Sequence, residues 1–127
     1  MAIIRLMEES EATGRVKEIF EEIKTTLGIP FVPQLFRALG PKPDQLEAGW
    51  AQVKGLFGSG SLDVRTKSLV ALAVAAAQRC SYFVKIHAIA AKRLGASDEE
   101  IAELLEVASL STALNTLVTG LGLDPEL

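Results

Sequence analysis

The stretch LDVRTKSLVALAVAAAQRCSYFVKIHAIAAKRLGASDEEI, residues 62–101, decides the fold of this chain. Ser61 or Asp63 can cap a helix that begins just after it and runs to about Gln78. The middle of this helix, residues 69–77, is apolar on every side. A helix without a polar face is expected at the centre of a domain or in an interface.

Two more helices follow in and beyond the same stretch. One covers about Cys80 to Leu94 and stops at Gly95. Ser97 and Glu100 have the spacing of a capping box, which predicts the start of a helix that runs to about Thr119. The inner stripe of this last helix is expected to hold Ile101, Leu104, Leu105, Ala108 and either Ala113 or Leu114.

The first half of the chain also has the periodicity of amphipathic helices, with apolar residues every three or four positions. Gly28 and Pro33 mark an end and a beginning of such helices. No segment alternates apolar and polar residues over a useful length, so the sequence predicts an all-α fold of five or six helices in a single domain, residues 1–127. The helices of the first half are expected at residues 9–27, 31–40 and 44–57, with linkers at 41–43 and 58–61.

Composition places the protein among globular chains. Of its 127 residues, 49% are hydrophobic and 23% are charged, which argues against disorder. The mean hydropathy of +0.29 is high for a short chain, so part of the apolar surface is expected in a subunit interface. The net charge is -3 and the basic residues are scattered, so nothing predicts nucleic-acid binding.

The chain has one cysteine, Cys80, and one histidine, His87. A single cysteine excludes an intrachain disulfide and fits a reducing cytoplasm, where we expect the protein. One Cys and one His cannot form a three- or four-ligand site within a chain, so we expect no metal. We also expect no cofactor. The N-terminus lacks a signal-peptide pattern, and the longest apolar run is far shorter than the about 20 residues of a membrane span.

Cys80 and His87 share one face of a predicted helix, but seven residues separate them by about 10 Å along its axis. A direct hydrogen bond needs roughly 3 Å, so direct proton transfer within one chain is not expected. Phe83 lies between them, and an aromatic ring transfers no proton. The helix dipole, with Arg79 and Lys85 nearby, favours a thiolate at Cys80.

Residues 62–101 resemble the core of the alkylhydroperoxidase D and carboxymuconolactone decarboxylase superfamily. The typical stretch there reads Leu-Asp-x-Arg-x-x-Glu-Leu, an Ala-rich helix, Cys-x-x-Cys-x-x-x-His and a Leu-Gly-Ala-(Ser/Thr)-x-x-Glu-Ile junction. FVPQLFRAL and the helix around Trp50 are also similar, so the resemblance covers about residues 15–120. It implies a small all-helical subunit of a homo-oligomer, a trimer or hexamer, with the site near a subunit interface.

In redox-active members the resemblance implies a proton relay of a Glu, two cysteines and a His. Cys80 matches the first cysteine and His87 the histidine, which makes them the candidate catalytic residues. The second cysteine falls on Phe83 and the glutamate on Ser68, so half of the relay is missing and dithiol chemistry is not expected. Tyr82, Phe83 and Ser68 are the candidate binding residues.

Three functions stay open on this basis, and whether the protein is an enzyme is undecided among them. The first is a thiol oxidoreductase of the peroxidase (antioxidant) type, in which Cys80 attacks a hydroperoxide and an external thiol reductant restores it. The second is an enzyme of the decarboxylase branch that acts on a lactone or carboxylic acid, with His87 as acid/base and Arg79 or Lys85 holding the anion. The third is a non-catalytic oligomer that binds a small apolar ligand or a partner protein.

Overall fold

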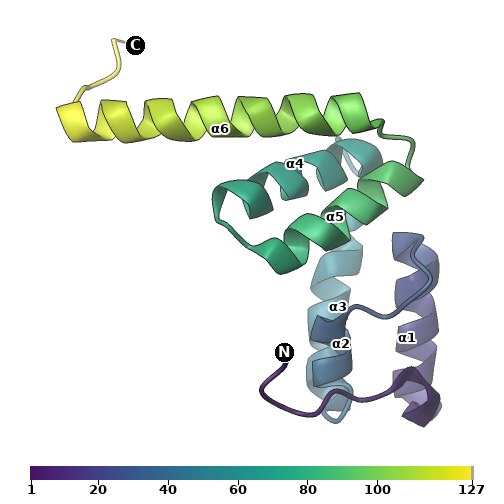
Figure 1. Ribbon diagram of the computed structural model, residues 1–127. Coiled ribbons are helices and arrows are strands. Elements are labelled where there is room, and N and C mark those ends of the chain that lie inside the picture. The colour runs from purple at the N-terminus through teal and green to yellow at the C-terminus, as the bar shows by residue number, and fades with distance from the viewer. Residues whose placement is uncertain (127) are drawn as a thin grey trace. The chain divides into compact units, whose positions relative to one another are not determined.

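The computed structural model describes residues 1–126, and these residues form six α-helices and one short 3₁₀ helix (Figure 1). The all-α prediction is confirmed. The chain divides into two compact units, one up to Val64 and the other from Arg65 onward, while the expectation of a single domain stays a prediction. The elements are η1 (Glu9–Glu11), α1 (Gly14–Leu27), α2 (Gln34–Leu39), α3 (Pro43–Phe57), α4 (Val64–Ala77), α5 (Ser81–Arg93) and α6 (Asp98–Leu121).

The first unit is a helical core in which α1 and α2 both pack on α3. The predicted apolar stripe of α1 is buried there, and the rings of Phe36 and Trp50 meet edge to face with their centroids 5.7 Å apart. Such aromatic pairs add about 1 kcal/mol to the stability that burial gives. The core residues are Ala12, Val16, Ile19, Phe20, Ile23, Val32, Phe36, Leu46 and Trp50.

Three helix starts in this unit differ from the sequence expectation. The helix expected at residues 31–40 begins only at Gln34, with Pro33 as its N-cap residue. Residues 9–13 do not belong to α1, because the chain turns as η1 and the helix begins only at Gly14. The carboxylate of Glu9 instead accepts a bond from the Val32 N–H (3.1 Å) and pairs with Lys24 (3.0 Å). Pro43 opens α3 rather than ending a linker, since the first helical position needs no N–H donor.

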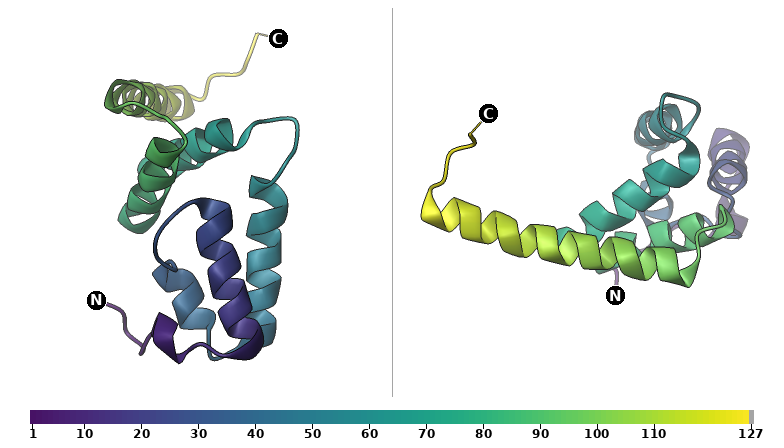
Figure 2. Two further views of the ribbon diagram at one scale, coloured as in Figure 1. Left: turned by 90° about the vertical axis from the view of Figure 1, so that its right-hand side faces the viewer. Right: turned by 90° about the horizontal axis from the view of Figure 1, so that it is seen from above.

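The second unit contains α4, α5 and α6. A tight turn joins α4 to α5, and α6 runs past both, so that its C-terminal half extends beyond them (Figures 1 and 2). Leu72, Ala90 and Ala91 are buried here, whereas Val70 and Val74 of α4 remain about half exposed. The fully apolar middle of α4 is therefore only partly covered by its own chain.

The predicted capping box begins α6. The hydroxyl of Ser97 accepts a bond from the Glu100 N–H (3.0 Å), and the Glu100 carboxylate accepts one from the Ser97 N–H (3.2 Å). Glu100 also forms an ion pair with Arg65 of α4, which ties the two helix starts together. Arg65 and the Ser97 backbone both lower the pKa of Glu100.

Only the first half of the predicted inner stripe of α6 is covered. Ile101, Leu104, Leu105 and Ala108 are partly buried, but Ala113 and Leu114 are exposed, which corrects the expectation for these two. The helix continues to Leu121, two residues past the expected end. Of the helices in residues 1–126, α6 alone has the length and composition of a membrane span, and none of that apolar window is buried. The same properties also suit a helix buried between subunits.

Candidate functional site

Cys80 lies in the corner between α4 and α5, where it belongs to the end of one helix and the start of the next. Its N–H donates to the Ala75 carbonyl (2.8 Å), and the N–H of Arg79 donates to the Ala76 carbonyl (3.1 Å). This pair of bonds is a Schellman motif that ends α4. Cys80 is also the N-cap residue of α5, and its thiol is free and half-buried.

Arg79 has a left-handed backbone with φ +59°, and it is the one non-glycine residue of the described chain with a positive φ. At the end of α5 the same motif uses Gly95, whose φ is +95°. A side chain in this conformation costs about 1 kcal/mol relative to glycine, so strain is concentrated next to the thiol.

Three aromatic side chains follow Cys80 on α5. The rings of Tyr82 and Phe83 meet edge to face (5.0 Å, 86°), and Phe83 stacks on His87 (5.3 Å, 18°). The side chain that replaces the second thiol therefore covers one face of the imidazole. All three rings are half-buried. The predicted position of Phe83 beside the histidine is confirmed.

Burial lowers the pKa of His87 below its ordinary value of 6.5. The imidazole is therefore neutral at pH 7, and a neutral imidazole can accept a proton. Seven helical residues still place it on the order of 10 Å from Cys80 along α5. His87 is suited to act on a bound molecule rather than on the thiol directly.

Ser68 lies on α4 and is 2% exposed. It shares the buried face of that helix with Leu72 and Ala75, at the spacing i, i+4 and i+7. The position where the resemblance implies a carboxylate thus faces the interior of the unit. Arg79 and Lys85, the two candidates for holding an anion, are exposed. The catalytic and binding roles given to these residues stay predictions.

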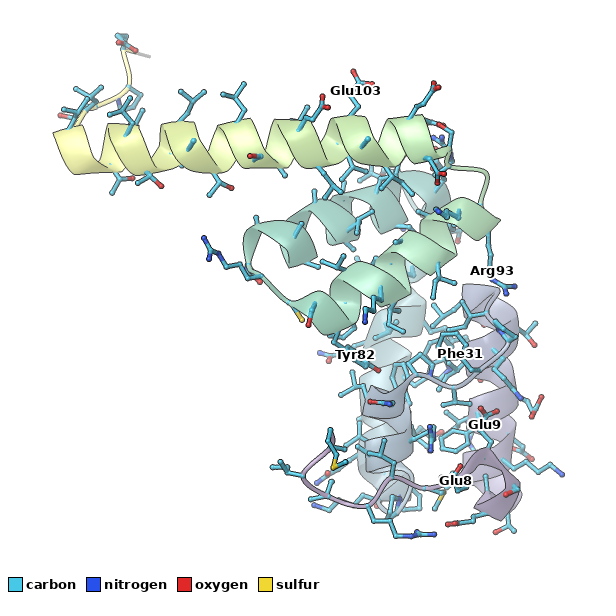
Figure 3. The ribbon with its side chains drawn as sticks, in the orientation of Figure 1. Glu8, Glu9, Phe31, Tyr82, Arg93 and Glu103 are labelled. Atoms are coloured by element: carbon cyan, nitrogen blue, oxygen red, sulfur yellow. The ribbon has the colours of Figure 1, made fainter. Side chains whose placement is uncertain are left out.

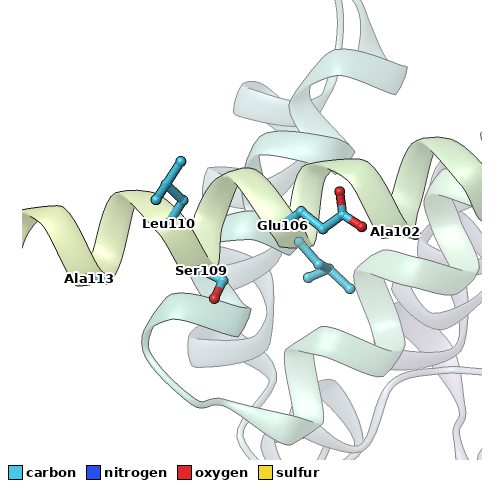
Figure 4. Close-up of a pocket in the computed structure, with 6 residues that line it drawn as sticks. Ala102, Glu106, Ser109, Leu110 and Ala113 are labelled. Carbon is cyan, nitrogen blue, oxygen red and sulfur yellow. The ribbon is translucent and has the colours of Figure 1, made fainter.

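No group of three or more His, Cys, Asp or Glu side chains in residues 1–126 is placed to hold a metal ion. One hollow that the sequence did not indicate runs along α6 (Figure 4). All of its lining residues come from that single helix, so it has no opposite wall and does not enclose a ligand. They are Ala102, Leu105, Glu106, Ser109, Leu110 and Ala113.

The chain is all-helical, and its thiol lies at the corner between an alanine-rich helix and the helix that carries His87. This is an alkylhydroperoxidase D-like fold. It superposes on the crystal structure of the alkylhydroperoxidase AhpD core from Rhodospirillum rubrum with a TM-score of 0.89 and 35% identity, over 99% of this chain and 95% of that one. A model of the carboxymuconolactone decarboxylase family matches residues 44–123. The chain belongs to this family, as the resemblance implied.

Two relatives are similar in sequence. An (R)-2-haloacid dehalogenase of Pseudomonas putida is 30% identical over 111 residues, which are 83% of this chain and 35% of that protein. Uncharacterized protein 4 in the cox locus of Paracoccus denitrificans is 41% identical over 63 residues, 50% of this chain and 57% of that protein. The chain thus spans about a third of the length of the first and over half of the second.

Proposed function

We propose that the protein is a one-cysteine thiol peroxidase of the alkylhydroperoxidase-like type, with Cys80 as the nucleophile. The observation that carries the proposal is the place of Cys80 at the N-cap of α5, half-exposed and held by the end of α4. At that position a hydroperoxide can reach the partly exposed sulfur from solvent, while the backbone bonds hold residue 80 in place. The likeness to the alkylhydroperoxidase core supports the same reading.

The chemistry takes place in three balanced steps. The Cys80 thiolate attacks the peroxide oxygen, the O–O bond breaks, an alcohol leaves after taking up a proton, and the sulfur becomes a sulfenic acid. An external thiol then forms a mixed disulfide with Cys80 and releases water. A second external thiol breaks that disulfide and restores Cys80. A reducing cytoplasm would supply these thiols.

The replaced residues explain why an external reductant is needed. In a dithiol enzyme the second thiol resolves the oxidised first one within the same chain. Here Phe83 holds that position and packs its ring on His87. The ring cannot resolve a sulfenic acid, so resolution requires a thiol from outside the chain.

The test uses the fact that Cys80 is the only cysteine. The reduced protein is mixed with a small excess of cumene hydroperoxide and dimedone, and its intact mass is followed over seconds to minutes. One dimedone adduct per chain, together with hydroperoxide consumption that depends on added dithiothreitol, is expected, and Cys80→Ser should abolish both. A wild-type thiol that stays unmodified while a free model thiol reacts would refute the proposal.

A second candidate function is favoured by the dehalogenase relative. In this reaction the neutral imidazole of His87 accepts a proton from water, the water oxygen bonds to the carbon that carries the halogen, and halide leaves. The exposed side chain of Arg79 or Lys85 holds the carboxylate of the substrate. We would incubate the protein with (R)-2-chloropropanoate and measure chloride release. Release that His87→Gln abolishes and Cys80→Ser leaves intact would support this function, and no release above a buffer blank would exclude it for this substrate.

A further inference from the structure

Residues 5–9, called the N-terminal strap below, precede α1 and are fastened to the first unit at several points. The Met7 N–H donates to the Arg37 carbonyl (3.2 Å), and the Arg37 Nε–H donates back to the Met7 carbonyl (2.8 Å). Arg37 also pairs with Glu8 (3.2 Å), and Glu9 adds the bonds described above. Figure 3 shows Glu8 and Glu9 where the strap crosses from the end of α2 to the start of α1.

The side chain of Met7 anchors the strap through apolar contact. It is partly buried and packs on the core of the first unit. Its Sδ atom lies so close to Gly40, just past the end of α2, that a Cβ added at residue 40 would be only 2.7 Å from the sulfur. A glycine at residue 40 therefore gives the sulfur its place, because any larger residue there requires the Met7 side chain to move.

The Met7 sulfur can take up an oxygen atom. Its partial exposure lets a small oxidant reach the sulfur from solvent while the strap is in place. The sulfur attacks the outer oxygen of a hydroperoxide, the O–O bond breaks, and the leaving oxygen takes up the hydroxyl proton. The sulfur gives up two electrons and becomes a sulfoxide, and the hydroperoxide is reduced to an alcohol, or to water when it is hydrogen peroxide.

A sulfoxide does not suit the place that Met7 occupies. Its oxygen is a strong hydrogen-bond acceptor, and the closeness of Gly40 leaves no space for that oxygen on one side of the sulfur. A polar group without a partner is costly against an apolar core, so hydration of the S–O group favours the side chain in water. When the side chain lifts, the backbone of residue 7 moves with it, and this backbone carries both bonds to Arg37.

We propose that Met7 is a modification site, at which oxidation by a hydroperoxide to the sulfoxide releases the N-terminal strap from the end of α2. The opening is local, because Ala12 is buried in the core (6% exposed) and holds the chain just beyond the strap. The modification is reversible: a methionine sulfoxide reductase removes the oxygen as water while two thiols join in a disulfide. It does not depend on the function proposed for Cys80, because a different sulfur reacts.

Met1 provides an internal comparison. It is the second methionine of the chain, and its side chain is fully exposed. Oxidation of Met1 places an oxygen on a side chain that is already in water, so no contact with the first unit is lost. The two methionines therefore separate the effect of oxidation as such from the effect of oxidation at the strap.

The first experiment uses the full chain in a Cys80→Ser background, so that no thiol competes for the oxidant. The folded protein is treated with an excess of hydrogen peroxide, and mass spectrometry locates the added oxygen at Met1 and Met7. Hydrogen exchange of the Met7 and Val32 amides, which bond to Arg37 and to the strap, should become on the order of 10-fold faster. The buried part of α1 should exchange as before, and methionine sulfoxide reductase with dithiothreitol should restore the slow rates.

Met7→Leu keeps an apolar side chain but takes up no oxygen, so peroxide should leave its exchange rates unchanged. Met1→Leu is the matched control and should respond as the parent protein does. Unchanged exchange in a chain that carries the Met7 sulfoxide, or equal acceleration in Met7→Leu, would overturn the proposal. Faster exchange throughout α1 would overturn it as well, since the whole unit would then unfold, and so would a Met7 that stays reduced while Met1 is fully oxidised.

The second experiment tests the contact between Met7 and Gly40 without any oxidant. Gly40→Ala requires the Met7 sulfur to move and should speed exchange of the Met7 amide by a similar factor. Gly49→Ala is the matched control, because a Cβ at residue 49 meets its nearest neighbour, on Leu39, at an ordinary 3.7 Å and should leave the strap in place. Equal exchange in the two variants would show that this contact does not hold the strap, and the proposal would fall.

Discussion

Phe83→Cys should restore an intramolecular disulfide with Cys80. Residue 83 lies in the first turn of α5, so its Cβ is roughly 5–6 Å from that of Cys80, and a disulfide needs about 3.5–4.5 Å. Cys80 precedes the helix with φ -92° and ψ 87°, outside the helical region. A small rotation at this position closes the difference of about 1.5 Å without unwinding α5.

The structure also sets the expected change in stability. The substitution removes the Phe83 stack on His87 and half-buried apolar surface, which should lower the free energy of unfolding by about 1–3 kcal/mol in the reduced state. Closing a four-residue ring should restore about 2 kcal/mol on oxidation by the loop-entropy relation. At roughly 4 °C per kcal/mol for a chain of this size, the oxidised variant should melt about 8 °C above the reduced one.

The assay counts free thiols and follows melting by circular dichroism, before and after one equivalent of cumene hydroperoxide without any external thiol. Phe83→Cys should pass from two free thiols per chain to none, and no disulfide should link one chain to another. Tyr82→Cys is the matched control, because residues two apart on a helix do not face each other, and it should form no intramolecular disulfide. Two thiols that stay free in Phe83→Cys, or equal closure in Tyr82→Cys, would refute the placement of Cys80 at the start of α5.

Four further outcomes follow from the geometry. Burial lowers the pKa of His87, so the unfolded chain takes up a proton before the folded one as pH falls below about 6.5. Wild type should therefore lose stability relative to His87→Gln between pH 6.5 and 5. Urea melts measure the free energy of unfolding of both proteins, and parallel pH dependences would contradict this. Ser97→Ala removes the capping-box acceptor and should lower the free energy of unfolding by about 1 kcal/mol, measured against Ser109→Ala on the exposed surface of the same helix. Arg79→Gly should raise the free energy of unfolding by about 0.5–1 kcal/mol, because glycine adopts φ +59° without strain. A loss of stability would show that the arginine side chain contributes more than the backbone strain costs. Ile23→Ala removes a fully buried side chain of α1 and should lower the free energy of unfolding by about 2–5 kcal/mol. Thr26→Ala, on the exposed side of the same helix, should change the free energy of unfolding by under about 0.5 kcal/mol.

The helices were predictable wherever one local signal acted alone. Ser97 with Glu100 gave the start of α6, and Gly28 the end of α1, because capping side chains and left-handed glycines act over a few residues. The start of α1 was wrong because the helical spacing of residues 9–13 competes with the contacts of Glu9 to Val32 and Lys24. Those contacts join residues distant in the chain, and spacing alone does not reveal them.

The site was predictable as a set of positions but not as a set of contacts. The matched spacing placed Cys80 at a helix start and Phe83 beside His87, since both follow from helical geometry. The Schellman motif through Arg79 was not visible, because arginine is not a residue that signals a left-handed backbone. The exposure of Leu114 was missed because helical period alone does not say which of two apolar faces packs on the same chain.

The corner that holds Cys80 has a consequence for how chemistry can change in this family. The N–H groups of Arg79 and Cys80 donate to carbonyls of α4, and the Cys80 carbonyl accepts a bond from the Val84 N–H of α5, so backbone groups rather than the side chain at residue 83 hold residue 80 in place. Exchange between cysteine and phenylalanine at residue 83 therefore leaves the backbone of the corner intact. Descendants of one scaffold can gain or lose a resolving thiol by substitution alone, without insertion or deletion, so redox capacity and fold can be inherited separately.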